Sequence, residues 1–247
     1  MNELVFYDLK EAPGLTHSLA SQVAREVGRR IVSGAYKAGE LIEDESALAD
    51  KYQVSRSVLR DAIKIIVGKG LLEARRGIGT RVRSREHWTL LDDDILAWHL
   101  SAAPNPLFLQ ELVDFRGLIE PRAARWAAER GSDDGRREVM LAFMRMERQK
   151  GTVEEFVFAD ALFHRAIIRA AQNELVRALE GPIFSALLMS IRITNADPRF
   201  NEASLRLHRK VADAIEVRDG SEAEAAMEEL LVDANARLFE GTHAGPN

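Results

Sequence analysis

Apolar positions recur at helical spacing in two short segments that follow each other closely. Ala47, Leu48 and Tyr52 share one face of the first segment. A second set with the same period comes next: Val58, Leu59, Ala62, Ile63 and Ile66. Gln53 and Val54 supply the turn between the two segments, and the hydroxyl of Ser55 can cap the second helix. The pattern predicts a helix-turn-helix.

The polar face of the second helix is basic where the helix begins. Arg56, Ser57 and Arg60 lie away from the apolar face. A recognition helix presents side chains to base edges and phosphates from this position. These three side chains are therefore candidates for DNA contact.

A short basic hairpin is predicted after this helix. Residues 71–74 and 80–83 read as two strands, joined by Arg75, Arg76, Gly77, Ile78 and Gly79. A tight basic wing can lie along a DNA groove, and its glycines let the backbone approach closely. Together with the two helices, the hairpin predicts a winged helix-turn-helix.

The remainder of the chain has the pattern of helices alone. In residues 107–130 the apolar positions recur at helical spacing: Leu109, Leu112, Phe115, Leu118, Ile119 and Ala123. Turn or cap residues interrupt the pattern at 104–106, 131–135, 151–152, 172–173, 195–198 and 219–221. We predict a mainly α protein, with a winged helix-turn-helix domain at 15–83, a polar linker at 84–89 and an all-α bundle of about seven helices at 90–240.

The distribution of charge agrees with this division. The chain has a formal charge of −5, yet residues 15–85 hold 14 Lys and Arg against 8 Asp and Glu. Only the first domain therefore suits a polyanionic partner. The absence of cysteine excludes disulfide scaffolds and cysteine-rich zinc sites. The sequence shows neither a signal-peptide pattern nor an apolar run of about 18 residues, which predicts a cytoplasmic protein without a membrane partner.

The most specific chemistry in the second domain is the pair Asp160 and His164. Their four-residue spacing places a carboxylate and an imidazole on the same face of a helix. His208, on another amphipathic helix, is a third candidate ligand. Two histidines and one aspartate can bind a divalent metal and leave positions open to water or an effector. The same spacing also suits a surface pair or a hydrogen-bonded core histidine.

The first domain resembles the winged helix-turn-helix of the GntR family of bacterial transcription regulators. The segments IVSGAYKAGELI, VSRSVLRDAI and GLLEARRGIGTRV carry the resemblance. It implies DNA contacts at Arg56, Arg60, Arg76 and Gly77, to which their neighbours Ser57 and Arg75 are added. Ser46 stands where many members have a basic contact residue, so the resemblance allows a different operator sequence.

The second domain is similar to the FCD effector-binding domain of FadR-type GntR regulators. The segments FRGLIEPRAARWAAER, ADALFHRAIIRAAQN and LHRKVADAIEVRDGSEAEAAM carry this resemblance. It implies metal binding by Asp160, His164 and His208, whereas Leu230 stands in place of a fourth family histidine. The site then binds zinc, nickel or manganese through three protein ligands, binds metal weakly, or contacts an organic effector directly.

Arg116 matches a family arginine that engages carboxylate ligands. A guanidinium can give a carboxylate two parallel hydrogen bonds, and the alternative is a salt bridge with Glu120. The pattern around Trp88 and Trp98 looks like that of repressors of galactonate and related sugar-acid catabolism. The expected effector is thus an aldonate or a similar hydroxy acid, bound by Arg116 and the three metal ligands.

The resemblance implies a homodimeric repressor that leaves its operator when the effector binds. One short recognition helix reads few bases, which also favours a dimer on two half-sites. Two other functions stay open. One is a metal-dependent enzyme at Asp160, His164 and His208 with Glu120 as general base. The other is an architectural DNA-binding protein whose bundle has no effector.

Overall fold

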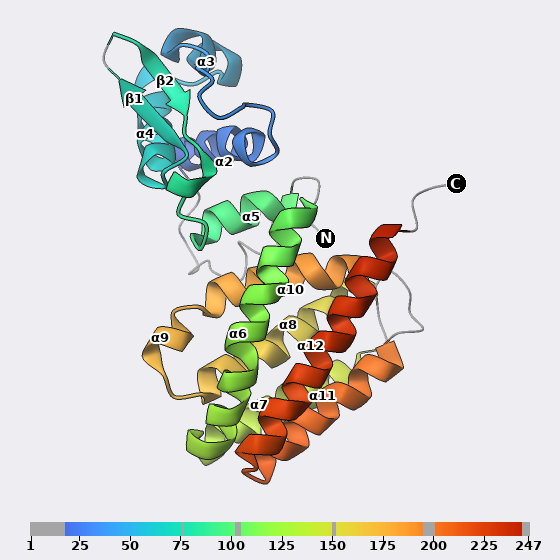
Figure 1. The fold of residues 1–247 in the computed structure, drawn as a ribbon. Helices are drawn as coiled ribbons and strands as arrows, with labels where there is room; N and C mark the ends of the chain where they lie inside the picture. The colour runs from blue at the N-terminus through green and yellow to red at the C-terminus, as the bar shows by residue number, and fades with distance from the viewer. Residues whose placement is uncertain (1–17, 76, 102–104, 150–151, 195–200, 244–247) are drawn as a thin grey trace. The chain divides into compact units, whose positions relative to one another are not determined.

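The computed structural model describes residues 18–75, 77–101, 105–149, 152–194 and 201–243, and Figure 1 traces the chain. The chain divides into two compact units, Met1–Pro104 and Asn105–Asn247. In the described ranges, no helix is both long enough and apolar enough to cross a membrane. The fold is mainly α with one small sheet, as the sequence predicts.

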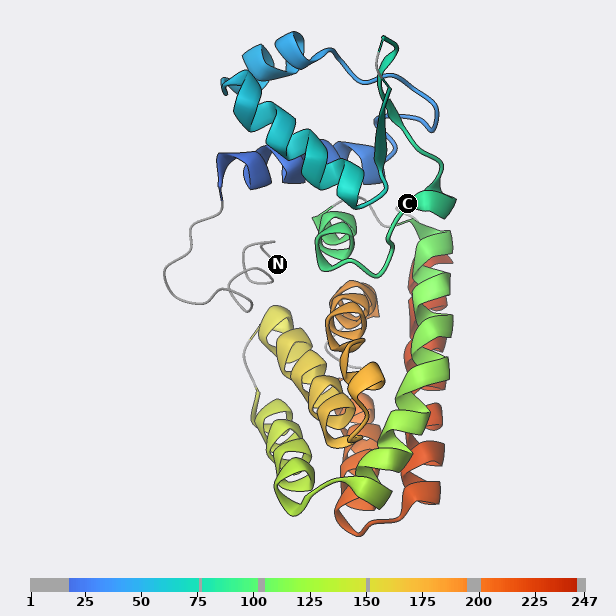
Figure 2. The ribbon, with the colours of Figure 1, turned by 90° about the vertical axis from the view of Figure 1, so that its left-hand side faces the viewer.

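The first unit is a winged helix-turn-helix. Its elements are α2 (Leu19–Val32), α3 (Glu45–Tyr52), α4 (Arg56–Gly68), β1 (Leu72–Arg75), β2 (Gly79–Val82), the 3-10 helix η1 (Arg85–His87) and α5 (Asp93–Ser101). Helix α4 packs across α2, and the hairpin follows the end of α4 (Figure 2). The predicted cap of α4 is confirmed, because Ser55 Oγ accepts a hydrogen bond from the Val58 amide at 3.3 Å. Gln53 ends α3 in the left-handed region, at φ 53°.

The hairpin is antiparallel and pairs Leu72 with Val82 and Arg75 with Gly79. Its strands are close to the predicted segments and differ by one residue at their ends. Gly70 turns the chain from α4 into β1 at φ 80°, and a Cβ there would collide with the carbonyl oxygen of His87. The turn therefore requires glycine for both its conformation and its close approach.

The core of the first unit is formed by buried apolar residues of its helices and its hairpin. Leu59 and Ile66 from α4 are buried together with Leu48 from α3. One prediction fails in detail: Ala47 is exposed, and Ala49 takes the buried place on α3. The helix is short, so its buried face is set by where α4 contacts it and not by helical period alone.

Helix α5 packs against α2 and adds Ile95 and Trp98 to this core. Lys69, the residue after α4, reaches the beginning of α5. Its Nζ lies 2.7 Å from Oδ1 of Asp92 and 2.7 Å from Oδ2 of Asp94. The segment 84–89, which was expected to be a linker, contains η1. The domain boundaries expected from the sequence remain predictions.

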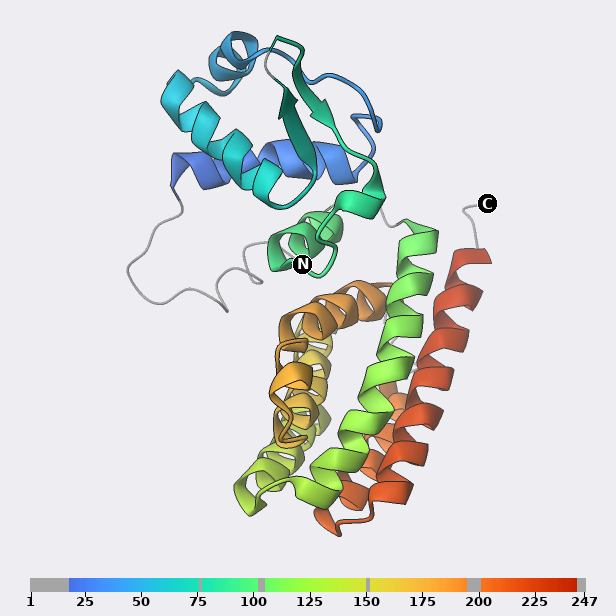
Figure 3. The same cartoon turned by 60° about the vertical axis from the view of Figure 1, so that its left-hand side comes forward.

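The second unit consists of helices in its described part. They are α6 (Pro106–Arg130), α7 (Asp133–Arg148), α8 (Val153–Ala170), α9 (Glu174–Arg177), α10 (Glu180–Thr194), α11 (Asn201–Glu216) and α12 (Gly220–His243). Helices α6 and α12 run side by side (Figure 3), and α8 packs against α6, α7 and α10. The break expected at 195–198 lies outside the described residues.

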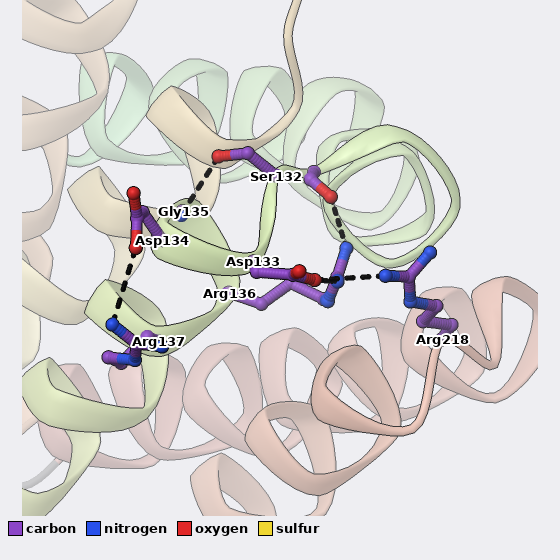
Figure 4. A network of polar contacts seen from close by, with 8 residues as sticks. Ser132, Asp133, Asp134, Gly135, Arg136, Arg137 and Arg218 are labelled. Atoms are coloured by element: carbon purple, nitrogen blue, oxygen red, sulfur yellow. Dashed lines mark hydrogen bonds and ion pairs between the residues drawn. The ribbon is translucent and has the colours of Figure 1, made fainter.

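The beginning of α7 is fixed by a polar network (Figure 4). Ser132 Oγ accepts a hydrogen bond from the Gly135 amide at 3.1 Å, which caps the helix. Asp133 contacts Arg136 of the same helix and also Arg218, at 2.9 Å, from the turn between α11 and α12. The predicted break at 131–135 is thus shorter than expected, because the cap lets α7 begin at Asp133.

Candidate nucleic-acid interface and metal centre

The predicted DNA-contacting residues of α4 lie on one exposed surface. Arg56, Ser57 and Arg60 are exposed in the first turns of the helix, away from the buried Leu59. Arg75 and Gly77 are exposed on the hairpin. Arg76 lies outside the described residues. The recognition helix therefore carries two guanidinium groups and a hydroxyl on the face that a DNA groove would contact.

Helix α3 contacts both of these arginines. Nε of Arg60 lies 2.8 Å from Oε2 of Glu45, and Nη2 of Arg56 donates a hydrogen bond to Oγ of Ser46 at 3.0 Å. The Arg60 side chain is 62% exposed, so the pair adds little stability. These contacts orient the two arginine side chains, because each guanidinium is held by a residue of α3 in the absence of DNA. Ser46 thus supports Arg56 from the position where the resemblance noted the absence of a basic contact residue.

The three predicted metal ligands come together inside the second unit. Asp160 and His164 lie one turn apart on α8, His208 comes from α11, and all three are buried. Nε2 of His208 lies 2.5 Å from Oδ1 of Asp160, and Nε2 of His164 lies 3.8 Å from the same oxygen. One ligand atom from each residue falls within 4.8 Å of the others, an arrangement that could hold a metal ion. The alternative of a surface pair is wrong for these buried side chains.

The donor atoms of this cluster fit a divalent cation. Nδ1 of His208 lies 2.6 Å from the Ser204 carbonyl oxygen, which favours a proton on Nδ1 and leaves a lone pair on Nε2. In the described part of the chain, four buried atoms of this region have no partner with hydrogen-bond geometry: Nε2 of His208, Oδ1 of Asp160, Nδ1 of His164 and Oε2 of Glu120. Such atoms cost free energy unless a ligand satisfies them.

The charge of Asp160 also suits a metal ligand. Burial alone would raise the pKa of this carboxyl group, but His208, His164 and Arg116 together lower it to about 2. Asp160 is therefore ionised at neutral pH, and a carboxylate with two imidazoles is a donor set that zinc, nickel and manganese accept.

Arg116 and Glu120 border the cluster from α6. Nε of Arg116 donates a hydrogen bond to Oε1 of Glu120 at 2.6 Å, so the salt bridge that the sequence allowed is present and buried. Oε2 of Glu120 contacts Nδ1 of His164. Burial would raise the pKa of Glu120, but the charges of Arg116 and His164 lower it to about 2. Leu118, expected on the apolar face, is instead 77% exposed.

The contact between Glu120 and His164 was not expected from the sequence. The one available signal was the Arg-x-x-x-Glu spacing within a helix whose neighbouring positions are apolar. Leu230, at the position of the fourth family histidine, is buried in α12 and has no atom that could bind a metal.

Two family descriptions match the chain. "Bacterial regulatory proteins, gntR family" matches residues 19–82, and "FCD domain" matches residues 111–233. The galactonate operon transcriptional repressor of Escherichia coli (strain K12) is 29% identical over 230 residues, which cover 92% of this chain and 100% of that protein. The HTH-type transcriptional regulator LutR of Bacillus subtilis (strain 168) is 31% identical over 204 residues, which cover 80% of this chain and 90% of LutR.

A solved structure supports the same fold. The structure of Lar, which controls the expression of the Listeria monocytogenes agr system, aligns with a TM-score of 0.64 and 18% identity. The alignment covers 92% of this chain and 99% of that one. The relatives are transcription regulators, which argues against the enzyme alternative. The matches to both of its domains show that the chain is a member of the GntR family of bacterial transcription regulators, with an FCD domain after the DNA-binding domain.

Proposed function

We propose that this regulator is a cytoplasmic repressor of an operon for the catabolism of a sugar acid or related carboxylate. A small hydroxy acid controls its operator affinity through a divalent metal held by Asp160, His164 and His208. The likeness to the galactonate operon repressor supports the class of effector. The observation that carries the proposal is the buried convergence of one carboxylate and two imidazoles on a single region of the bundle.

The bound metal would act as a Lewis acid that accepts oxygen ligands. With three protein ligands and no histidine at position 230, positions stay open for a carboxylate and its neighbouring hydroxyl. An aldonate carries both groups on adjacent carbon atoms. Arg116 is the anchor for the effector carboxylate, because its guanidinium is buried beside the cluster and can form a bidentate pair.

The DNA-binding surface follows from the first unit. Arg56, Ser57 and Arg60 contact the major groove, and Arg75, Arg76 and Gly77 contact the DNA from the wing. Because one recognition helix reads few bases, a homodimer that binds two half-sites provides the required specificity. Effector binding lowers the affinity of this dimer for the operator, and the two events are linked by a coupling free energy.

A thermal-shift experiment on the full chain tests the effector site. Metal-stripped protein is mixed with galactonate, gluconate or lactate, with and without zinc, nickel or manganese. We expect an aldonate to raise the melting temperature only when metal is present. At an aldonate concentration one hundred times its dissociation constant, binding adds about 2.7 kcal/mol to the free energy of unfolding. His208→Ala should abolish this response, whereas the control His87→Ala, at a half-exposed histidine of the other unit, should keep it.

The stabilising compound is then added to the protein bound to a labelled DNA fragment that was selected for binding to it. We expect release, measured as a fall in fluorescence anisotropy of the labelled DNA. Stabilisation by neither metals nor acids would contradict the effector site. DNA binding that no compound changes would favour the architectural alternative.

A further inference from the structure

One buried carboxylate contacts both a guanidinium and a ring of the metal cluster. Oε1 of Glu120 accepts the hydrogen bond from Arg116, and Oε2 contacts Nδ1 of His164. Glu120 is 1% exposed, and Arg116 and His164 are 4% and 2% exposed. Removing such a charge from water is costly, and the pairing of Oε1 with Arg116 offsets part of this cost. Oε2 and Nδ1 of His164 face each other at contact distance, but within the described ranges neither atom has a partner with hydrogen-bond geometry. The three side chains therefore act as one connected set.

We propose that Glu120 is a positioning residue of the metal centre. Its Oε2 accepts the Nδ1 proton of His164, which directs Nε2 of the same ring toward Asp160 and the metal, and Arg116 holds Glu120 in place. The inference rests on the proposed function, because it concerns the same metal cluster. It adds a role for a residue that supplies no ligand.

The two histidines of the cluster support this assignment because they are arranged alike. Each ring turns Nε2 toward Oδ1 of Asp160, at 2.5 Å for His208 and 3.8 Å for His164. Each ring also turns Nδ1 toward an oxygen: the Ser204 carbonyl for His208 and the Glu120 carboxylate for His164. Histidines that bind metals commonly donate their second ring N–H to such an acceptor, which fixes the tautomer and the ring orientation.

The geometry also separates Glu120 from the direct ligands. The two nitrogens of an imidazole point away from each other, so an oxygen at Nδ1 lies on the opposite side of the ring from a metal at Nε2. Glu120 contacts Nδ1, whereas Asp160 lies nearest Nε2. Glu120 thus does not replace the missing histidine at position 230, and its effect on the metal passes through His164.

Arg116 completes the set and connects it to the effector. The described contacts of its guanidinium involve Nε, which faces Glu120. Among the described residues, no hydrogen bond or ion pair is formed by its two terminal nitrogens. A carboxylate can take that edge while Glu120 keeps the other. The residue that anchors the effector therefore also holds the residue that orients a metal ligand.

The variant Glu120→Gln tests the proposal with little change of volume. A carboxylate offers two acceptor oxygens, whereas an amide offers one oxygen and an NH2 group that cannot accept. The amide in this variant can therefore serve His164 or Arg116 but not both. The matched control is Glu129→Gln, because Glu129 pairs with Arg125 at the same four-residue spacing on the same helix, 2.8 Å apart, in a partly exposed position.

Metal affinity and the spectrum of bound Co²⁺ are measured for the full chain after metal removal. We expect Glu120→Gln to weaken Co²⁺ and Zn²⁺ binding about 10- to 100-fold and to shift the visible absorption of bound Co²⁺, and Glu129→Gln to change neither. Arg116→Gln should weaken binding less, and the double variant should bind no more weakly than Glu120→Gln alone. Unchanged affinity and spectrum in Glu120→Gln would overturn the proposal.

A second measurement needs no substitution and so does not depend on the folding of a variant. In the ¹⁵N-labelled parent protein loaded with Zn²⁺, long-range ¹H–¹⁵N correlations report which ring nitrogen of each histidine carries a proton. The proposal expects the proton of His164 on Nδ1 and the metal on Nε2. Metal on Nδ1 would overturn it.

The outcomes distinguish this inference from the proposed function. If Glu120→Gln binds metal like the parent while His208→Ala does not, the cluster stands and the role of Glu120 is wrong. If the parent protein binds none of these metals, both the metal centre and the role of Glu120 are wrong.

Discussion

The substitution Gly28→Ala tests the packing of α5 against the winged helix-turn-helix. Gly28 lies within α2, and a Cβ built on it would fall well inside contact distance of three atoms of the Trp98 indole. Trp98 is 1% exposed and packed in the core of this unit. The added methyl group must displace either the ring or the helix.

The expected effect is the difference between two opposing contributions. Alanine favours a helix interior over glycine by about 1 kcal/mol. Overpacking of a rigid core costs roughly 1–3 kcal/mol, and contact with a buried indole ring places this site near the upper limit. We therefore expect Gly28→Ala to lower the free energy of unfolding by about 2 kcal/mol.

Urea unfolding of the full chain, followed by tryptophan fluorescence and circular dichroism, measures this change. The matched control is Gly68→Ala at the end of α4, where nothing lies within 4 Å of the added Cβ. That variant should gain roughly 0.5–1 kcal/mol, since only the helix preference acts. Equal stabilisation by both substitutions would refute the close packing of Trp98 on α2.

Three further predictions concern the same unit. Arg60→Ala should weaken operator binding by about 1–3 kcal/mol, measured by anisotropy, while the thermal shift with effector stays as in the parent; loss of both responses in a folded variant would contradict the separation of roles. Lys69→Met should leave Asp92 and Asp94 without their partly buried cation and destabilise the unit by about 1 kcal/mol in urea, and an unchanged midpoint would show that the ion pairs are not formed. Burial lowers the pKa of His99 from 6.5 to about 4, a shift opposed by its hydrogen bond to Ile95 and assisted by Arg85. The unfolded chain then binds more protons between these values, so about 2 kcal/mol of stability should be lost between pH 7 and pH 5, and a His99→Gln variant that keeps the full loss would exclude this origin.

Local features of the fold could be read from the sequence. Ser55 caps α4 as predicted because an N-cap depends on residues within one turn. The hairpin is also nearly where it was expected, since glycines limit where strands can begin and end. Helix α5 shows the limit of such reasoning, because its apolar residues indicate burial but not which unit buries them.

The metal cluster could be predicted in part for the same reason. Asp160 and His164 share a helix, so their spacing brings them together. His208 was a candidate on another amphipathic helix, and the resemblance implied its place beside them, because spacing along the chain cannot bring two helices together. Glu120 was weighed as the partner of Arg116 four residues away, and its contact with His164, between α6 and α8, depends on how the helices cross. At Leu118 the helical period was misleading. It placed this side chain in the core, but α6 buries the charged pair Arg116 and Glu120 and leaves Leu118 exposed.

The link between Lys69 and the beginning of α5 has a mechanical consequence. Lys69 ends the recognition helix, and its ammonium group lies between Asp92 and Asp94, while Trp98 rests on α2. The recognition helix, the wing and α5 consequently share one core and have few independent degrees of freedom. A torque applied to α5 would turn the DNA-reading surface as a rigid body, so the spacing between its arginines stays constant while its orientation changes.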